Sequence, residues 1–340
     1  MSKKYDIAVV GATGIVGGAM LEILAERTFP VGTVYALASE RSIGKEVDFG
    51  HRSLAVDNLA DFDFSNVQIG LFSAGSSISA EFAPQAAAAG CIVIDNTSQF
   101  RYDDDVPLVV PEVNAKDIAN YRTRGLIANP NCSTIQMVVA LKPIYDAVGI
   151  ERINVATYQA VSGAGRDAVE ELVRQTTSML NGRPVEIDGN AKQIAFNAVP
   201  HIDDFQDNRY TKEEMKMVWE TRKIFGDDDI LVNPTAVRVP IFYGHCEAIH
   251  IETKAKITAA EVCKLMHEAA GVELIDGVDT GQYPTAVTDS SGSDAVFVGR
   301  VREDISHPRG INLWVVSDNV RKGAALNSVQ IAEILAKNYL

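Results

Sequence analysis

The sequence predicts an α/β protein of two domains. The first has a doubly wound parallel sheet, and the second is an α+β domain with a mostly antiparallel sheet. Short apolar runs alternate with Ala-rich helical runs in the first third, and a glycine-rich turn joins the first strand to the first helix. Longer strands follow the segment Asn129–Asn131. A chain of 340 residues, 46% of them hydrophobic, has enough length and apolar content for two cores.

The first domain is expected to hold strands that are apolar on both faces, with helices between them. Strands of this kind are buried on both sides in parallel sheets, and right-handed crossovers then place helices over both faces. The expected strands are Asp6–Val10, Thr33–Ala38, Val67–Phe72 and Cys91–Asp95, and the expected helices are Gly14–Glu26 and Ala80–Ala89.

The second domain is expected to begin with a helix from about Cys132 to Val148, which Gly149 stops. The following strands are longer, and the last alternates apolar and polar residues, as in an antiparallel sheet with one covered face. The expected strands are Ile153–Gln159, Thr235–Phe242 and Ala248–Ile257, and the expected helices are Asp167–Leu180, Lys212–Phe225 and Ala259–Ala270. A terminal helix over Ala324–Lys337 is expected to return to the first domain. The predicted domains are therefore 1–130 completed by 324–340, and 131–323.

The charge of the chain limits its partners. Forty-five acidic and 31 basic residues give a net charge of −14, which disfavours nonspecific attraction to nucleic acid or to an anionic membrane. Four cysteines without a CxxC pair form neither a disulfide framework nor a zinc site, and favour a reducing compartment. Lys3 and Lys4 precede an apolar stretch that Asp6 interrupts, so we expect no signal peptide and a cytoplasmic location.

A glycine-rich turn, Gly11-Ala-Thr-Gly14-Ile-Val-Gly17, lies between the first expected strand and helix. Gly11 permits a tight turn, Gly14 lets phosphate approach the backbone, and Gly17 permits close packing of the helix on the sheet. The helix N-terminus supplies free N–H groups for that phosphate. This context favours a Rossmann-like dinucleotide site, and a glycine-rich turn without a ligand is the alternative.

The end of the second expected strand bears on the choice of dinucleotide. An acidic residue there holds the ribose of NAD, whereas an arginine accommodates the 2′-phosphate of NADP. The sequence reads Ala38-Ser39-Glu40-Arg41-Ser42. Arg41, together with the hydroxyls of Ser39 and Ser42, indicates NADP, whereas the acidic Glu40 favours NAD. A solvated polar loop is the alternative reading.

Cys132 stands in the segment NPNCST, at the expected start of the linking helix. Most lone cysteines are small buried hydrophobes, and Cys91 and Cys263 fit that description. Cys132 differs because a helix N-terminus favours the thiolate, which is the nucleophilic form. A thiolate beside a nicotinamide suggests aldehyde oxidation through a thiohemiacetal and a thioester.

Such chemistry also needs an acid/base group. His245, in VPIFYGHCE, lies between two β-rich runs where a side chain can enter a cleft. A neutral imidazole can accept the proton of the thiol or of the thiohemiacetal. Arg238, seven residues earlier, could hold a substrate carboxylate with two hydrogen bonds. Its alternative is an ordinary surface arginine on a strand.

Taken together, these motifs resemble the aspartate-β-semialdehyde dehydrogenase family over nearly the entire chain. The matching segments are GATGIVG, ASERSIGK, the segment ending Gln99-Phe100-Arg101, NPNCST, YQAVSGAGR, RVPIFYGHCE and SDNVRKGAA. The resemblance implies NADP as cofactor and interconversion of L-aspartate 4-semialdehyde plus phosphate with L-4-aspartyl phosphate. That step feeds lysine, threonine, methionine and diaminopimelate synthesis. The resemblance also implies a homodimer, with pairing of dimers into tetramers left open.

Matched residue by residue, the resemblance implies four sets of site residues. The catalytic set is Cys132 as nucleophile, His245 as acid/base and Gln159, which orients the substrate. Arg238 and Glu220 would hold the substrate carboxylate and ammonium, and the phosphate would be bound by Arg101, Asn131 and Lys223. The cofactor set is Gly11, Thr13, Gly14, Ile15 and Val16 at the pyrophosphate, Ser39, Arg41 and Ser42 at the 2′-phosphate, and Ser162, Gly163 and Asn319 beside the nicotinamide.

Some alternatives stay open. Taken without the family pattern, Glu220 and Lys223 suit an ion pair on a solvated helix face. Thr97, Gln99 and Cys246 depart from the residues usual in the family and put local packing in doubt. An N-acetyl-glutamyl phosphate reductase shares this chemistry, although a free ammonium needs an acidic partner such as Glu220. A catalytically silent nucleotide-binding relative is the rival from another class, and a glyceraldehyde-3-phosphate dehydrogenase lacks its surrounding motifs here.

Overall fold

The structure, a computed structural model, describes residues 3–187, 189 and 191–340. These residues form two compact units. One runs to Asn131 and resumes at Ala324–Leu340, and the other is Cys132–Gly323. Each unit is built on its own sheet. No helix of the described residues is long and apolar enough to cross a membrane.

The first unit holds a seven-stranded sheet in the order β3-β4-β2-β1-β5-β6-β7. Neighbouring strands are parallel, except that β3 and β4 form an antiparallel edge. Its strands are β1 (Tyr5–Val10), β2 (Val31–Ala38), β3 (Glu46–Phe49), β4 (Arg52–Asn58), β5 (Ile69–Phe72), β6 (Ile92–Asp95) and β7 (Leu126–Ala128). Its helices are α1 (Ile15–Glu26), α2 (Ser76–Ala88), α3 (Pro111–Asn114) and α8 (Leu326–Asn338).

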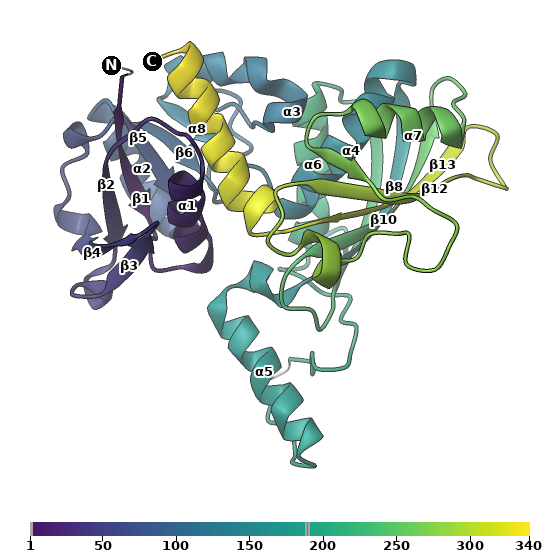
Figure 1. Ribbon diagram of the computed structural model, residues 1–340, viewed down its shortest axis with the longest axis horizontal. Helices are drawn as coiled ribbons and strands as arrows, with labels where there is room; N and C mark the ends of the chain where they lie inside the picture. The colour runs from purple at the N-terminus through teal and green to yellow at the C-terminus, as the bar shows by residue number, and fades with distance from the viewer. Residues whose placement is uncertain (1–2, 188, 190) are drawn as a thin grey trace. The chain divides into compact units, whose positions relative to one another are not determined.

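Helices cover both faces of this sheet, as its uniformly apolar strands require. Ile7 and Val9 of β1 share one hydrophobic cluster with residues of α1 and α8, and α2 packs against β5 and β6 from the other side (Figure 1). The first strand and the last helix therefore lie side by side. The hydroxyl of Tyr5 donates to the carbonyl of Ala336 at 3.0 Å.

The second unit holds a six-stranded mixed sheet in the order β11-β12-β13-β10-β8-β9. The four central strands are antiparallel, and each edge strand pairs in parallel with its neighbour. Its strands are β8 (Ile150–Gln159), β9 (Leu231–Arg238), β10 (His245–Thr253), β11 (Val272–Leu274), β12 (Val296–Glu303) and β13 (Gly310–Ser317). Its helices are α4 (Cys132–Val148), α5 (Arg166–Leu180), α6 (Lys212–Phe225) and α7 (Ala259–Glu268).

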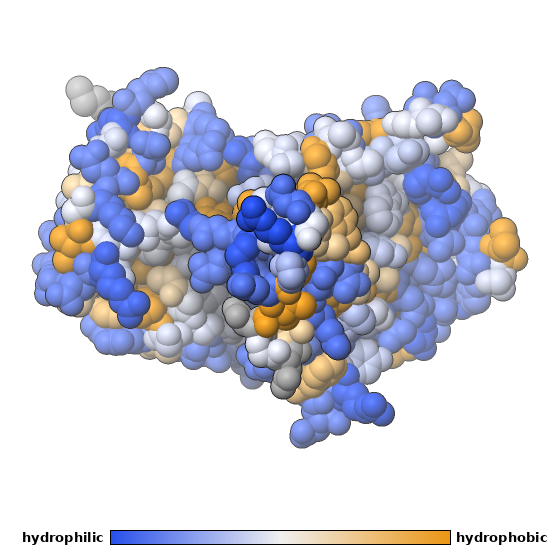
Figure 2. Space-filling model, turned by 90° about the horizontal axis from the view of Figure 1, so that it is seen from below, coloured by the Kyte–Doolittle hydropathy of each residue, from blue (hydrophilic) through white to orange (hydrophobic). Residues whose placement is uncertain are grey.

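Three of these helices, α4, α6 and α7, pack along the sheet, and α5 projects away from it (Figure 1). The start of α6 is fixed by a capping box, in which Thr211 accepts from the N–H of Glu214 and the Glu214 carboxylate accepts from the N–H of Thr211. Figure 2 looks toward α5 and shows hydrophobic residues among charged ones on this face. Val173, Met179 and Leu180 of α5 are exposed, Leu180 by 75%.

The predicted fold class is confirmed, and most predicted elements are present with shifted ends. The predicted strand Thr235–Phe242 was wrong at its end, because β9 stops at Arg238 and Pro240 beyond it has no N–H for a ladder. The strand predicted over Ala248–Ile257 begins earlier, at His245, and ends at Thr253. The strands β3, β4, β7, β11, β12 and β13 and the short helix α3 were not predicted.

Candidate active site

Cys132 is the first residue of α4 and is partly exposed. The N–H groups of the first helical turn have no acceptors within the helix, so the field at this end favours an anion. Gly323 packs closely against it. A Cβ added to Gly323 would lie 2.9 Å from the Cβ of Cys132, and only glycine leaves room there.

His245 opens β10 and is completely buried. The N–H of Ala160 donates to its Nδ1 at 3.0 Å, which places the ring proton of the neutral imidazole on Nε2. Burial, followed by the positive charge of Arg238, lowers the pKa of His245 to about 3. The imidazole is therefore neutral at physiological pH. Its Nε2 makes no hydrogen bond to any described residue and lies against the backbone of Gly163.

Arg238 ends β9, beside the same turn. Its guanidinium donates to the carbonyl of Ala160 at 2.7 Å. Burial lowers its pKa, and the negative charges of Glu213 and of a Cys132 thiolate oppose that effect. Arg238 is thus within electrostatic reach of the cysteine, which brings the candidate nucleophile, the histidine and the arginine into one constellation within the second unit.

Gln159, the last residue of β8, is held by two side chains. Its amide nitrogen donates to Glu213 at 3.0 Å, and its oxygen accepts from the hydroxyl of Thr157 at 2.9 Å. Glu213 is only 5% exposed and also forms an ion pair with Lys216 at 2.9 Å. Sequence reasoning missed Glu213, because an acid in the first turn of a helix is ordinary surface chemistry. No signal in the sequence alone distinguishes it from its neighbours.

Ser162 and Asn319, predicted to border the nicotinamide, do lie together. The amide nitrogen of Asn319 donates to the Ser162 hydroxyl at 2.9 Å. The Asn319 oxygen accepts from the N–H of Gly244 at 2.8 Å. Since Gly244 directly precedes His245, these hydrogen bonds hold the backbone at the start of β10. Gly163 lies beside it, against Arg238 and His245.

Glu220 lies on α6 and is completely buried. The solvated ion pair that its spacing with Lys223 suggested is therefore wrong for this residue. Lys223 is partly buried one turn farther along the helix. Glu213 and Glu220 are two turns apart, so one face of α6 carries two buried acids.

Arg101 and Asn131, the other predicted phosphate ligands, belong to the first unit and are buried there. The guanidinium of Arg101 donates to the carbonyl of Asn96 at 2.9 Å. The unusual Thr97 has a clear local role, because its hydroxyl and N–H both bond to the buried carboxyl of Asp95, at 2.8 and 3.0 Å. At Thr97, these bonds show how the local structure accommodates the unusual residue.

The unusual Cys246 lies on the opposite face of β10 from His245. It packs with Phe297 and Val316, and burial raises the pKa of its thiol to about 12. This inert thiol is far from nucleophilic at physiological pH. Cys132 therefore remains the candidate nucleophile.

The glycine-rich turn borders a hollow of about 490 Å³ in the first unit. Gly11 has φ +88°, and a Cβ there would lie 3.0 Å from the backbone of Ala74, while one on Gly17 would lie 2.1 Å from the carbonyl of Gly11. These turns follow β1 and β5, where the order of a doubly wound sheet reverses and nucleotides bind. The hollow is lined by Gly11, Thr13, Gly14, Ala38, Ser39, Glu40, Asn58, Leu59, Ala60, Ser73, Ala74, Ile78 and Phe82.

Four of the cofactor residues predicted in the first unit are outside this lining. Ile15 and Val16 begin α1 just beyond the turn. Arg41 and Ser42 lie on the short turn after β2, where Arg41 is exposed and Ser42 is buried. Ser39 and Glu40, at the same strand end, do line the hollow.

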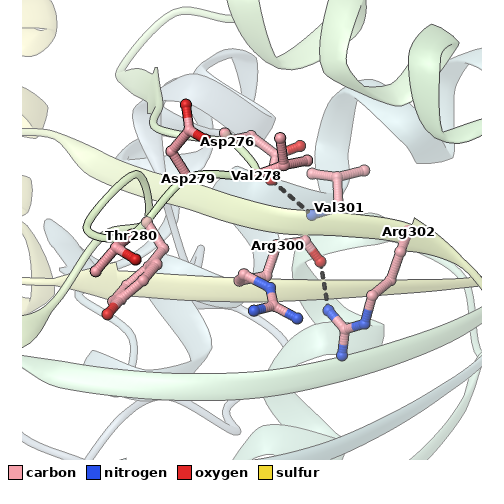
Figure 3. A pocket seen from close by; sticks show the side chains of 9 residues that line it. Asp276, Val278, Asp279, Thr280, Arg300, Val301 and Arg302 are labelled. Atoms are coloured by element: carbon pink, nitrogen blue, oxygen red, sulfur yellow. Dashed lines mark hydrogen bonds between the residues drawn. The ribbon is translucent and has the colours of Figure 1, made fainter.

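A separate hollow of about 520 Å³ lies in the second unit, around β12 (Figure 3). Asp276 accepts there from the N–H of Val301 at 3.1 Å, and the guanidinium of Arg302 donates to the carbonyl of Arg300. None of the predicted site residues lines it. Within the described ranges, no group of three or more His, Cys, Asp or Glu residues could hold a metal ion.

Comparisons with known proteins identify the family of the chain. Residues 6–121 match the family model described as semialdehyde dehydrogenase, NAD binding domain, and residues 141–322 match semialdehyde dehydrogenase, dimerisation domain. Aspartate-semialdehyde dehydrogenase of Shewanella violacea is 62% identical over 339 residues, which span all of both proteins. The chain belongs to the aspartate-semialdehyde dehydrogenase family.

Solved structures of this family share the fold. Aspartate semialdehyde dehydrogenase II of Vibrio cholerae, crystallised as a complex with ASA, superimposes with a TM-score of 0.97 at 61% identity and full coverage of both chains. The family's enzyme from Candida albicans, solved with NADP, has a TM-score of 0.79 at 25% identity, over 99% of this chain and all of the other. The predicted resemblance is thereby confirmed.

Proposed function

We propose that this chain is an NADP-dependent aspartate-semialdehyde dehydrogenase. It interconverts L-aspartate 4-semialdehyde plus phosphate with L-4-aspartyl phosphate, in the biosynthesis of lysine, threonine, methionine and diaminopimelate. The observation that carries this proposal is a cysteine at a helix N-terminus, within the field of a half-buried arginine and in one unit with a buried neutral histidine. Family membership over the full chain supports the choice of reaction.

Cys132 is the nucleophile of this proposal. The N-terminus of α4 and the charge of Arg238 both stabilise its thiolate. The thiolate attacks the aldehyde carbon, the carbonyl π electrons move to oxygen, and a tetrahedral alkoxide forms on the sulfur. Loss of hydride gives a thioester, which phosphate then attacks to release aspartyl phosphate and regenerate the thiolate. N–H groups near Cys132 can stabilise the alkoxide, and one such donor is often worth ~3 kcal/mol.

His245 supplies a hydrogen bond from Nε2 to this alkoxide. To act as a base through Nε2, the ring must first move its proton to Nδ1, which breaks the hydrogen bond from Ala160. The depressed pKa favours the donor state, because a neutral imidazole with its proton on Nε2 polarises a carbonyl without becoming charged. The acid/base role of His245 is therefore assigned to steps in which the hydrogen bond from Ala160 is broken.

The amino-acid end of the substrate is assigned to the charged groups of α6 and β9. Arg238 pairs with the substrate carboxylate, and Glu220 with the ammonium. Gln159, held by Glu213 and Thr157, orients the reacting carbonyl and the thioester. A buried acid such as Glu220 gives a free ammonium a partner that an N-acylated substrate does not need, so the reductase alternative is disfavoured.

Phosphate binding is assigned to Arg101, Asn131 and Lys223. The guanidinium and the ammonium match the charge of the anion, and Asn131 directly precedes Cys132 in the chain. These three assignments rest on the family motifs and on the chemistry of the side chains.

The first unit is the proposed NADP domain, residues 1–130 completed by 324–340, and 131–323 is the catalytic and dimerisation domain. The hollow at the Gly11 turn suits a dinucleotide, because it lies beside a glycine-rich turn that leads into a helix N-terminus, and only glycine at Gly11 and Gly17 permits the close backbone packing of that turn. Bound NADP supplies the hydride acceptor, and NADPH the hydride in the reverse direction. Thr13–Val16 hold the pyrophosphate, and Ser39, Arg41 and Ser42 the 2′-phosphate. Ser162, Gly163 and Asn319 border the nicotinamide.

We place the protein in the cytoplasm as a homodimer. The match to a dimerisation domain covers most of the second unit. The sheet face opposite α4 carries Tyr158, which is 37% exposed and contacts Trp314 at a ring distance of 5.6 Å. Aromatic residues of this kind are enriched in protein interfaces, so this face suits a second copy. A reducing cytoplasm agrees with four free thiols among the described residues.

The test is phosphate-dependent growth of NADPH absorbance with aspartate semialdehyde. The proposal predicts turnover that requires both phosphate and NADP. Turnover without phosphate, or a preference for N-acetyl-glutamate semialdehyde, would contradict it. No turnover by properly folded protein would favour the silent nucleotide-binding alternative.

A further inference from the structure

Glu247 is a completely buried carboxyl group that the proposed mechanism does not use. It lies on β10 two residues after His245, so both side chains point to the same face of the sheet. That face is covered by α4, where Gln136 is 1% exposed. Gln136 is one turn after Cys132, on the same side of the helix.

The side chains of Glu247 and Gln136 lie near each other, and neither makes a hydrogen bond to a described residue. Both carboxyl oxygens of Glu247 and both polar atoms of the Gln136 amide are buried without a hydrogen-bond partner among the described residues, each other included. Burial raises the pKa of Glu247 well above its ordinary range, and the nearby Gln136 amide opposes this effect. Buried polar groups almost always find partners, so these two are suited to each other.

Their chemistry matches when the carboxyl is protonated. Its O–H can donate to the Gln136 oxygen, and the Gln136 amide can donate to the carboxyl oxygen. The groups around the carboxyl are Gln136 from α4, Thr157 opposite it on β8, and the neutral imidazole of His245 farther along β10. Thr157 in turn bonds to Gln159, so this buried polar layer reaches the site.

We propose that Glu247 is a positioning residue that, with Gln136, ties α4 to β10 and so fixes Cys132 and His245 relative to each other. The proposal rests on the proposed function, and the activity of the parent enzyme tests that function separately. Glu247 works as a neutral acid. An ionised carboxylate behind the site would oppose formation of the Cys132 thiolate and draw a proton to His245.

The first test is steady-state kinetics of the full-length enzyme with aspartate semialdehyde, phosphate and NADP. Glu247→Gln keeps the shape and the neutral charge, so kcat is expected to stay within about twofold of the parent. Glu247→Leu and Gln136→Leu each lower kcat about tenfold or more with KM little changed, since a displacement of ~1 Å can lower rates about 100-fold. The controls are Glu268→Gln and Glu268→Leu, at an exposed position on α7, which leave kcat unchanged.

The second test is the pH dependence of stability, measured as urea midpoints of the parent and Glu247→Gln. Because the pKa of Glu247 is raised in the folded protein, its carboxyl loses its proton near pH 4.5 in the unfolded chain but keeps it above that pH in the folded chain. The parent therefore loses stability as pH rises above that value, and the Gln variant does not. We expect a higher midpoint for Glu247→Gln at neutral pH and a gap that closes on acidification.

Three results would overturn the proposal. If Glu247→Gln lost as much kcat as Glu247→Leu, an ionised carboxylate would be required. If both leucine variants matched the parent in kcat, the pair would position nothing. If the midpoint gap did not change with pH, Glu247 would not be a neutral acid. Should Glu247→Leu fail to fold, Gln136→Leu and Glu247→Gln decide the matter by the same measurements.

Discussion

At the scale of residues, burial decides which form each ionisable group of the site takes. His245 is neutral because burial and Arg238 both oppose its protonation. Arg238 keeps its charge because Glu213 and the thiolate form of Cys132 offset its own burial. The site thus combines a stabilised anion, a fixed cation and an uncharged hydrogen-bond donor. That combination suits attack by sulfur on a carbonyl and stabilisation of the resulting alkoxide.

The neutral state of His245 predicts a pH-dependent stability. Its pKa is about 3 in the folded protein against an ordinary 6.5, so between these values the unfolded chain binds more protons. Stability contributed by this group is present above pH 6.5 and is lost as pH falls toward 3. Relative to His245→Asn, the parent should lose about 1.4 kcal/mol of unfolding free energy per pH unit across that window. A difference between the two proteins that stays constant with pH would contradict the buried neutral imidazole.

Glu213 predicts a kinetic effect. It accepts from Gln159 and stabilises Arg238, so Glu213→Gln removes a charge that two site residues depend on. We expect kcat/KM for aspartate semialdehyde to fall about tenfold or more, as when a charge-assisted hydrogen bond is weakened. The exposed Glu268→Gln is the control. Unchanged kcat/KM would show that Lys216 and the remaining contacts hold the site without this acid.

At the scale of elements, four helices and strands of the second unit each place a proposed site residue at one of their ends. Cys132 begins α4, His245 begins β10, Gln159 ends β8 and Arg238 ends β9. Element ends carry free backbone groups and abrupt changes of direction, so side chains there can converge while the elements themselves stay rigid. Glycines in the adjoining turns make this convergence possible.

Gly323 tests this arrangement directly. Its backbone packs so closely on Cys132 that an added Cβ would lie 2.9 Å from the cysteine Cβ. Gly323→Ala should therefore displace the nucleophile and lower kcat about tenfold to 100-fold, while NADP binding persists. Gly18→Ala is a suitable control, because that glycine has open space around it. Equal kcat in Gly323→Ala and the parent would show that the sulfur is not held by this contact.

The elements that could be predicted from the sequence are those with strong local signals. The helix from Cys132 to Val148 was predicted at both ends, because a polar starting segment and Gly149, which has φ +69°, mark them. The strands β12 and β13 were missed, although each contains an apolar run, AVFV at 295–298 and LWVV at 313–316, between polar segments. Glu220 and Glu213 look like surface acids in the sequence, and only tertiary packing buries them.

At the scale of the whole molecule, we expect the bound cofactor to stabilise the folded chain against heat. A ligand that binds only the folded state stabilises it by about 2.7 kcal/mol at 100 times its Kd. We expect NADP to raise the melting temperature of the full chain more than NAD at equal concentration. Arg41→Ala should remove most of this difference, since a guanidinium binds the 2′-phosphate more strongly than the ribose hydroxyl. An unchanged NADP-to-NAD difference would mean that other residues select the cofactor.

The proposed reaction depends on one sulfur, that of Cys132, which carries the substrate as an acyl group. Mass spectrometry of enzyme quenched during turnover, with phosphate withheld to slow release, measures it most directly. We expect an aspartyl adduct on the peptide that contains Cys132, absent from Cys132→Ala and lost when phosphate is added. Turnover without any adduct on that peptide, or near-parent activity of Cys132→Ala, would contradict the account.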